Sequence, residues 1–92
     1  MKQKRIRWTV RALQRLDEIG AYIAHDDPDA AARVVACVDT LAELPNAGRI
    51  GRITGTREVV LSDIPYIIPY RVRQYIEIIT VMHASQKWTK RL

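Results

Sequence analysis

Cysteine is nearly absent from this sequence of 92 residues, in which Cys37 is the only one. A single thiol cannot form an internal disulfide, so we interpret Cys37 as a small buried hydrophobe in a reducing compartment. There is no apolar run long enough to span a membrane, and no apolar segment follows the basic start "MKQKRIRWTV" as a secretory signal would require. We therefore expect one cytoplasmic domain over residues 1–92 with no membrane association.

The residue clusters that support metal binding or covalent catalysis are also missing. His25 and His83 are far apart and show no zinc-type spacing with the lone cysteine, so neither a metal nor a cofactor is expected. The stretch "GRIGRITG" has no helix after it and no lysine ending, which a nucleotide-binding loop needs. Ser62 and Ser85 lie outside any nucleophile motif.

Acidic residues are scarce in the second half of the chain. Residues 1–44 carry equal numbers of basic and acidic side chains, whereas residues 45–92 hold eight Lys and Arg against three acidic residues. The whole net charge of +5 therefore comes from the second half. Such an excess favours an acidic partner, either nucleic acid or an acidic protein segment, although ordinary solubilising charge explains it equally well.

Hydrophobic periodicity predicts a short strand followed by two helices. Ile6 and Trp8 alternate with basic residues in "RIRWT", as in a half-buried strand. Thr9 is a good N-cap for an amphipathic helix through residue 25, whose predicted apolar face contains Val10, Leu13, Leu16, Ile19 and Ile23. A second helix is predicted with Asp27 as N-cap, Pro28 in the first position and Pro45 as terminator. The two helices should form an antiparallel hairpin.

The pattern changes after the second helix. Three glycines with interspersed arginines in "NAGRIGRITGTRE" predict a mobile basic loop, and three strands are then predicted at 57–61, 66–72 and 75–83. Because Pro69 lacks a backbone donor, we predict a bulge or a missing ladder bond there. The expected fold class is α+β, in the order β-α-α-β-β-β, with the helix hairpin packed on an antiparallel sheet.

One set of residues could form a metal-free ribonuclease site, because arginines bind phosphates, histidine exchanges protons near neutral pH and tryptophan stacks on bases. The same side chains could instead be solvated strand ends and an anchor for the tail. The set consists of Arg49, Arg52, Arg57, Arg71, His83, Lys87 and Trp88.

The series "RWTVRALQRLDEIGAYIA", "LAELPNAGRIGRITGTREVVL", "PYIIPYRV" and "IEIITVMHASQKW" resembles the RelE/ParE superfamily of bacterial type II toxins over nearly the whole chain. The resemblance implies the fold order given above and a linked antitoxin that wraps the toxin. RelE-like members cleave mRNA on the ribosome without a metal, whereas ParE-like members inhibit DNA gyrase and are not known as nucleases.

Several positions favour the ParE branch. RelE-like nucleases typically carry a phosphate-contacting arginine where this sequence has Ile67, and a tyrosine near the C-terminus where it has Trp88. An aliphatic side chain cannot stabilise charge on a phosphorane. The resemblance therefore implies a gyrase inhibitor with no catalytic residues. If the chain were a nuclease, with the ribosome and mRNA as its targets, the catalytic set would be Arg49, Arg52, Arg57 and His83.

Contacts with partners follow from the same resemblance. Arg57, Arg71, His83, Lys87 and Trp88 are expected to touch the target or another partner. A small acidic antitoxin should order on the toxin in a groove between the helix hairpin and the sheet, and operator DNA should be bound only through the complex with the antitoxin. A degenerate toxin that binds only its antitoxin stays an alternative. The antitoxin-binding residues are expected to be Leu13, Leu16 and Tyr22.

Overall fold

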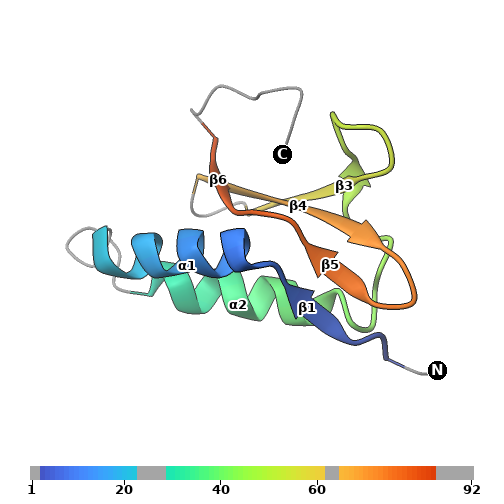
Figure 1. Cartoon of the computed structure of the whole chain (residues 1–92), viewed down its shortest axis with the longest axis horizontal. Helices are drawn as coiled ribbons and strands as arrows, with labels where there is room; N and C mark the ends of the chain where they lie inside the picture. The colour runs from blue at the N-terminus through green and yellow to red at the C-terminus, as the bar shows by residue number, and fades with distance from the viewer. Residues whose placement is uncertain (1–2, 23–28, 62–64, 85–92) are drawn as a thin grey trace.

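The computed structural model describes residues 3–22, 29–61 and 65–84, with side chains described for all of these except 19–22. Two helices lie on one side of a sheet (Figure 1). No helix in these ranges is both long and apolar enough to cross a membrane. The elements are α1 (Val10–Tyr22), α2 (Ala30–Thr40), β1 (Ile6–Trp8), β2 (Arg49–Ile50), β3 (Arg57–Val60), β4 (Tyr66–Val72), β5 (Ile76–Ile78) and β6 (Met82–His83).

Helix α1 begins where Thr9 joins it to the sheet. The Thr9 hydroxyl oxygen accepts a hydrogen bond from the Ala12 N–H at 3.1 Å, which confirms the predicted N-cap. The same hydroxyl donates to the Ile79 carbonyl at 2.8 Å, and the Thr9 N–H donates to the Ile78 carbonyl at 3.1 Å. The first turn of α1 is thus fixed to the end of β5.

The buried face of α1 differs from the predicted one. Ala12 is completely buried and Leu16 packs against the core, but Val10 and Leu13 are exposed. The Arg15 Nε donates to the Val81 carbonyl at 3.1 Å, which turns this side of the helix toward the strands. The prediction of an amphipathic helix from the hydrophobic period was therefore correct. The predicted rotation of the helix about its axis, which sets the residues that face the core, was wrong.

Helix α2 is shorter than predicted at both ends. Its N-cap position is held by Asp29, while the expected cap Asp27 lies outside the described residues. The helix ends at Thr40 because the following N–H groups of Ala42 and Glu43 bond to carbonyls three residues back, which tightens the chain into turns. Leu41 is buried at this end, whereas Leu44 is exposed.

The strands of the described residues form a six-stranded sheet in the order β1-β5-β4-β3-β2, with β6 also paired to β4. The ladders between β2, β3, β4, β5 and β6 are antiparallel, and β1 lies parallel to β5 at the edge. The predicted α+β class is confirmed. The strand predicted at 75–83 divides into β5 and β6. The sheet is mixed rather than purely antiparallel, because its edge strand β1 is parallel to β5.

Pro69 lies within the central strand β4, opposite Glu58 of β3. On its other side the ladder is interrupted, because Ile68 and Pro69 face three residues, 79–81, between the registered pairs Tyr70↔Ile78 and Ile67↔Met82. The Pro69 carbonyl accepts from the Ile79 N–H at 3.1 Å, so the missing donor of Pro69 faces this interruption. The predicted bulge is present, but the extra residue belongs to the partner strand.

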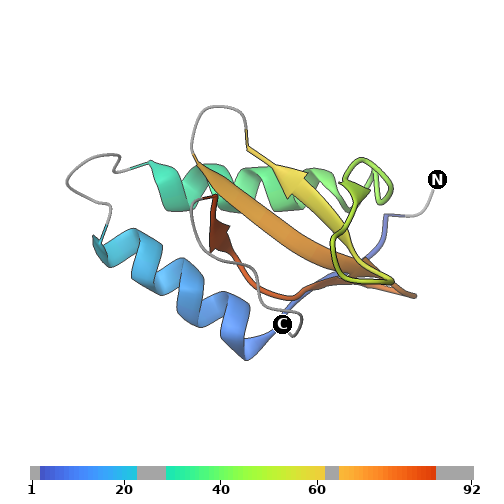
Figure 2. The ribbon, with the colours of Figure 1, turned by 90° about the horizontal axis from the view of Figure 1, so that it is seen from above.

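The core fills the space between the sheet and the two helices. Alternate residues of β4, Tyr66, Ile68 and Tyr70, point toward the helices, as do Ile76 and Ile78 of β5. Figure 2 looks onto the sheet from the opposite side, with β4 crossing in front of α2. From the helices, the buried partners are Ala12, Ala30, Val34, Val38 and Leu41.

Candidate functional site

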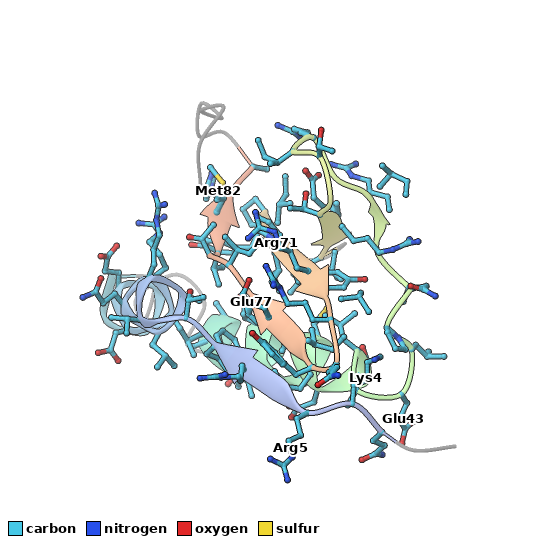
Figure 3. All side chains as sticks on the ribbon, turned by 45° about the vertical axis from the view of Figure 1, so that its right-hand side comes forward. Lys4, Arg5, Glu43, Arg71, Glu77 and Met82 are labelled. Atoms are coloured by element: carbon cyan, nitrogen blue, oxygen red, sulfur yellow. The ribbon has the colours of Figure 1, made fainter. Side chains whose placement is uncertain are left out.

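The face of the sheet that points away from the helices, here called the open face, carries three rows of side chains. Residues opposite one another in a ladder share a face, so the registers define each row. Figure 3 shows Met82, Arg71 and Glu77 following one another along this face. The rows are Val60, Ile67 and Met82; then Arg49, Glu58 and Pro69; then Arg71, Glu77 and Arg7.

Glu58 is the most deeply buried charged group of the open face, with an exposed fraction of 1%. Its Oε1 accepts hydrogen bonds from Arg49 Nε at 3.1 Å and Arg49 Nη2 at 3.0 Å. Its Oε2 accepts from the Arg52 backbone N–H at 2.9 Å, and Arg52 Nε lies 3.8 Å from Oε1. One buried carboxylate therefore holds two arginines, which is how a buried charge is tolerated.

Residues 48–58, here called the arginine hairpin, fold back on themselves. The Gly51 N–H donates to the Thr56 carbonyl at 2.8 Å, and the Thr56 hydroxyl donates to the Ile53 carbonyl at 2.6 Å. A Cβ on Gly51 would lie 2.9 Å from the Thr56 carbonyl oxygen, and Gly55 turns the chain at a φ of +82°. The predicted mobile loop is thus corrected to a hydrogen-bonded hairpin that contains β2.

Glu77 forms a second, more exposed cluster on the open face. Its Oε1 lies 3.5 Å from Arg71 Nη1 and 3.8 Å from Arg73 Nε. The guanidinium carbon of Arg7 lies 5.2 Å from the centre of the Tyr75 ring, within cation–π range. These longer, half-exposed contacts constrain their arginines less than Glu58 does.

Arg57 and Tyr70 lie on the other face of the sheet, where they support the arginine hairpin. Arg57 Nη1 donates to the Gly48 carbonyl at 2.8 Å and approaches the Asn46 carbonyl at 3.4 Å. The Tyr70 hydroxyl donates to the Pro45 carbonyl at 2.7 Å and accepts from the Gly48 N–H at 2.9 Å. Burial raises the pKa of Tyr70, so its phenol stays neutral and able to donate.

His83 lies at the opposite end of β4. It pairs with Tyr66, and the two rings meet edge to face with their centres 5.4 Å apart. Burial also raises the pKa of Tyr66, against a smaller lowering by Arg15. This pair and the Arg57↔Tyr70 pair are four positions apart along β4, about 13 Å of extended strand.

The structure therefore separates the four residues predicted for a nuclease site. Arg49 and Arg52 converge on Glu58 on the open face, whereas Arg57 and His83 stand at opposite ends of β4 on the other face. Of the predicted contact residues, Arg71 is half-exposed beside Glu77, and Lys87 and Trp88 lie outside the described residues.

The residues predicted to bind an antitoxin lie on α1. Leu13 is 50% exposed, with Val10 one turn before it also exposed, while Leu16 is half-buried against the core. The side chain of Tyr22 lies outside the described part. Sequence reasoning missed Glu58, although an acidic residue directly before two valines and shortly after three arginines was a usable signal.

Comparison with known proteins identifies the family. The model of the ParE toxin of the type II toxin–antitoxin system parDE matches residues 6–88. Y4kP, a candidate toxin of Sinorhizobium fredii, is 70% identical over 92 residues that cover 96% of each chain. The toxin RelE2 of Caulobacter vibrioides is 38% identical over 84 residues, which cover 86% of this chain and 93% of that protein.

Two solved structures share the fold. The chromosomal ParDE toxin–antitoxin system of P. aeruginosa matches with a TM-score of 0.78 and 26% identity, over 90% of this chain and 98% of that chain. The toxin–antitoxin complex RelBE2 of Mycobacterium tuberculosis matches with a TM-score of 0.71 and 23% identity, over 88% and 98%. The chain described here belongs to the ParE toxin family within the RelE/ParE superfamily of type II toxins.

Proposed function

We propose that this toxin arrests growth by binding and inhibiting DNA gyrase, and that a cognate antitoxin neutralises it. The match to the ParE family over residues 6–88 supports the first part. The second is supported by the similar P. aeruginosa structure, which is described as a toxin–antitoxin system.

The observation that carries the gyrase proposal is the environment of Ile67. This side chain is 4% exposed and stands in an aliphatic row with Val60 and Met82 on the open face. A group that stabilises a phosphorane must be charged or a strong hydrogen-bond donor, and isoleucine is neither. The separation of Arg57 from His83 along β4 adds to this argument, because general acid–base catalysis needs its groups within reach of one substrate.

The antitoxin is proposed to cover the start of α1. Val10 and Leu13 are exposed one turn apart, so an apolar stripe is available to the amphipathic helix of a partner. Leu16 extends this stripe toward the core. Truncation of Leu13 to alanine should weaken antitoxin binding by about tenfold, measured by calorimetry, and should change the stability of the isolated toxin little.

A side-by-side assay of one toxin preparation tests the proposed target. We expect inhibition of gyrase supercoiling, relieved by the antitoxin, and no codon-located cuts in translated mRNA by primer extension. Unaltered supercoiling and gyrase-mediated DNA cleavage at saturating toxin would sink the proposal.

Two other results would favour one of the alternative functions, mRNA cleavage or a degenerate toxin. The 38% identity to the toxin RelE2 makes mRNA cleavage the second candidate. Cuts that disappear in the His83→Ala and Arg57→Ala variants would establish it. Antitoxin binding without growth arrest on induction would indicate a degenerate toxin.

A further inference from the structure

We propose that the arginine hairpin is the contact for an acidic segment of a protein partner, and that Glu58 is the positioning residue that sets Arg49 and Arg52 for it. This inference rests on the proposed function, in which the toxin acts by binding a protein target.

Glu58 fixes the geometry of the two arginines. Two hydrogen bonds to Oε1 of Glu58 fix the plane of the Arg49 guanidinium, because Nε and Nη2 both donate to it. The Arg52 backbone donates to Oε2, so the carboxylate holds both arginine-bearing segments at once. The two arginine side chains still have exposed fractions of 54% and 47%. They are therefore pre-organised and accessible, which lowers the entropy cost of binding a further anion.

The donors of the two arginines suit a carboxylate. The guanidinium groups of Arg49 and Arg52 both approach the carboxylate of Glu58. A guanidinium offers five donors, and paired arginines bind a carboxylate through short, charge-assisted hydrogen bonds. The exposed parts of these side chains can interact in the same way with a carboxylate supplied by a partner.

Exposed apolar surface beside the arginines favours a protein over a nucleic acid as the partner. Val60 follows Glu58 by two residues on β3, lies on the same open face and is half-exposed, whereas the exposed Ile50 pairs with Arg57 and lies on the other face. A phosphate backbone gains little from contact with a valine, whereas a protein segment with both acidic and apolar side chains satisfies both groups. Among the described strands, the hairpin lies at the β2 edge of the sheet.

Substitution Glu58→Gln in the full-length chain tests this proposal. A positioning role and a purely electrostatic role of Glu58 predict changes of opposite sign in the affinity for an anionic ligand. If Glu58 were only a negative charge beside the arginines, its removal would strengthen anion binding. A positioning role predicts the opposite, a loss of about tenfold in affinity for a synthetic peptide of glutamate with interspersed leucine. Glu43→Gln removes the same charge from an exposed site outside the hairpin, where Glu43 accepts a hydrogen bond from Gln3, and should leave the affinity unchanged.

Two further measurements test the positioning role even if the Glu58→Gln variant is less stable than the wild type. Arg49→Lys preserves the charge but not the fork of donors, and should also weaken peptide binding. In the free wild-type chain, the Arg49 Nε–H resonance should exchange slowly with water, and this protection should vanish in Glu58→Gln. Tighter or equal peptide binding by Glu58→Gln would overturn the positioning role.

Competition identifies the class of partner. Single-stranded and duplex DNA should displace the peptide poorly, and displacement as effective as that by unlabelled peptide would overturn the choice of a protein partner. The gyrase assay separates the two proposals. Wild-type toxin that leaves gyrase active, but binds the peptide in a Glu58-dependent way, would refute the target and retain the hairpin contact.

Discussion

The two faces of the sheet use opposite ways of holding side chains in place. The face under the helices is aliphatic and aromatic, and Ile68, Ile76 and Ile78 are completely buried there. Beside one aliphatic row, the open face carries two carboxylates, Glu58 and Glu77, each next to two arginines. Burial of apolar area supplies most of the stability of a small domain, whereas half-exposed ion pairs supply little. One face is therefore suited to stability and the other to recognition.

The arginine hairpin connects the two. The guanidinium groups of Arg49 and Arg52 lie on the open face, but the hairpin backbone is held from the other face by Tyr70 and Arg57. A change on the covered face can therefore alter recognition on the open one.

Aliphatic substitutions on the two faces provide the strongest test of the contrast. Ile78→Ala truncates a fully buried side chain on the face under the helices and should lower the free energy of unfolding by about 3 kcal/mol. Val60→Ala truncates a half-exposed side chain on the open face and should change it by less than about 0.5 kcal/mol. Urea unfolding followed by circular dichroism measures both. Equal losses would remove the distinction between the faces.

Two glycines of the hairpin separate close packing from backbone conformation. Gly51→Ala places a methyl group against Thr56 and should cost about 2 kcal/mol, because the hairpin must open to accept it. Gly55→Ala meets no atoms but forces alanine to a φ of +82°, at a cost of about 1 kcal/mol. Thermal unfolding compares the two variants. A neutral Gly51→Ala would show that the hairpin is loosely closed.

Tyr70→Phe tests the link between the faces. Loss of the hydroxyl leaves the Gly48 N–H without its partner and should cost about 1.5 kcal/mol. We also expect weaker peptide binding, because the hairpin loses a support on the covered face. The fluorescence-detected unfolding midpoint and the peptide affinity report the two effects separately. An unchanged affinity would mean that Glu58 alone orders the arginines.

The same tyrosine predicts a pH dependence. Because burial raises the pKa of Tyr70 in the folded state, the unfolded chain loses this proton first. Its contribution is complete below about pH 10 and declines as the pH rises toward the folded-state pKa. Stability measured between pH 8 and 11 should therefore fall less in Tyr70→Phe than in the wild type. Tyr66, whose pKa is also raised, contributes equally to both proteins.

Local features of the fold were predictable from the sequence. Thr9 was identified as the N-cap of α1 because a hydroxyl before a helical period satisfies an unpaired N–H, and the structure contains that bond. The bounds of β4 at 66–72 were also predicted, since β-branched and aromatic residues continue through Pro69. The rotation of α1 could not be read in the same way, because it depends on the packing of Ala12 and Arg15 against other elements.

The candidate site was predictable in part. The arginines of the hairpin were identified from charge and spacing, and Ile67 from its place in the family pattern. The glycines of this segment predicted a loop. Only the close approach of Thr56 to Gly51 in the structure shows that the segment is a closed hairpin. Arg57 was predicted to contact a partner, which stays a prediction; the structure adds that its guanidinium donates to the Gly48 carbonyl.

The sequence by itself determined the family, the two amphipathic helices, the α+β class and the excess of positive charge in the second half. Each of these depends on local pattern or on composition. Only the tertiary structure decided which charges act together. Arg49 meets Glu58, nine residues away, because β2 and β3 pair in one register, and a shift by one residue would have sent Glu58 to the aliphatic face.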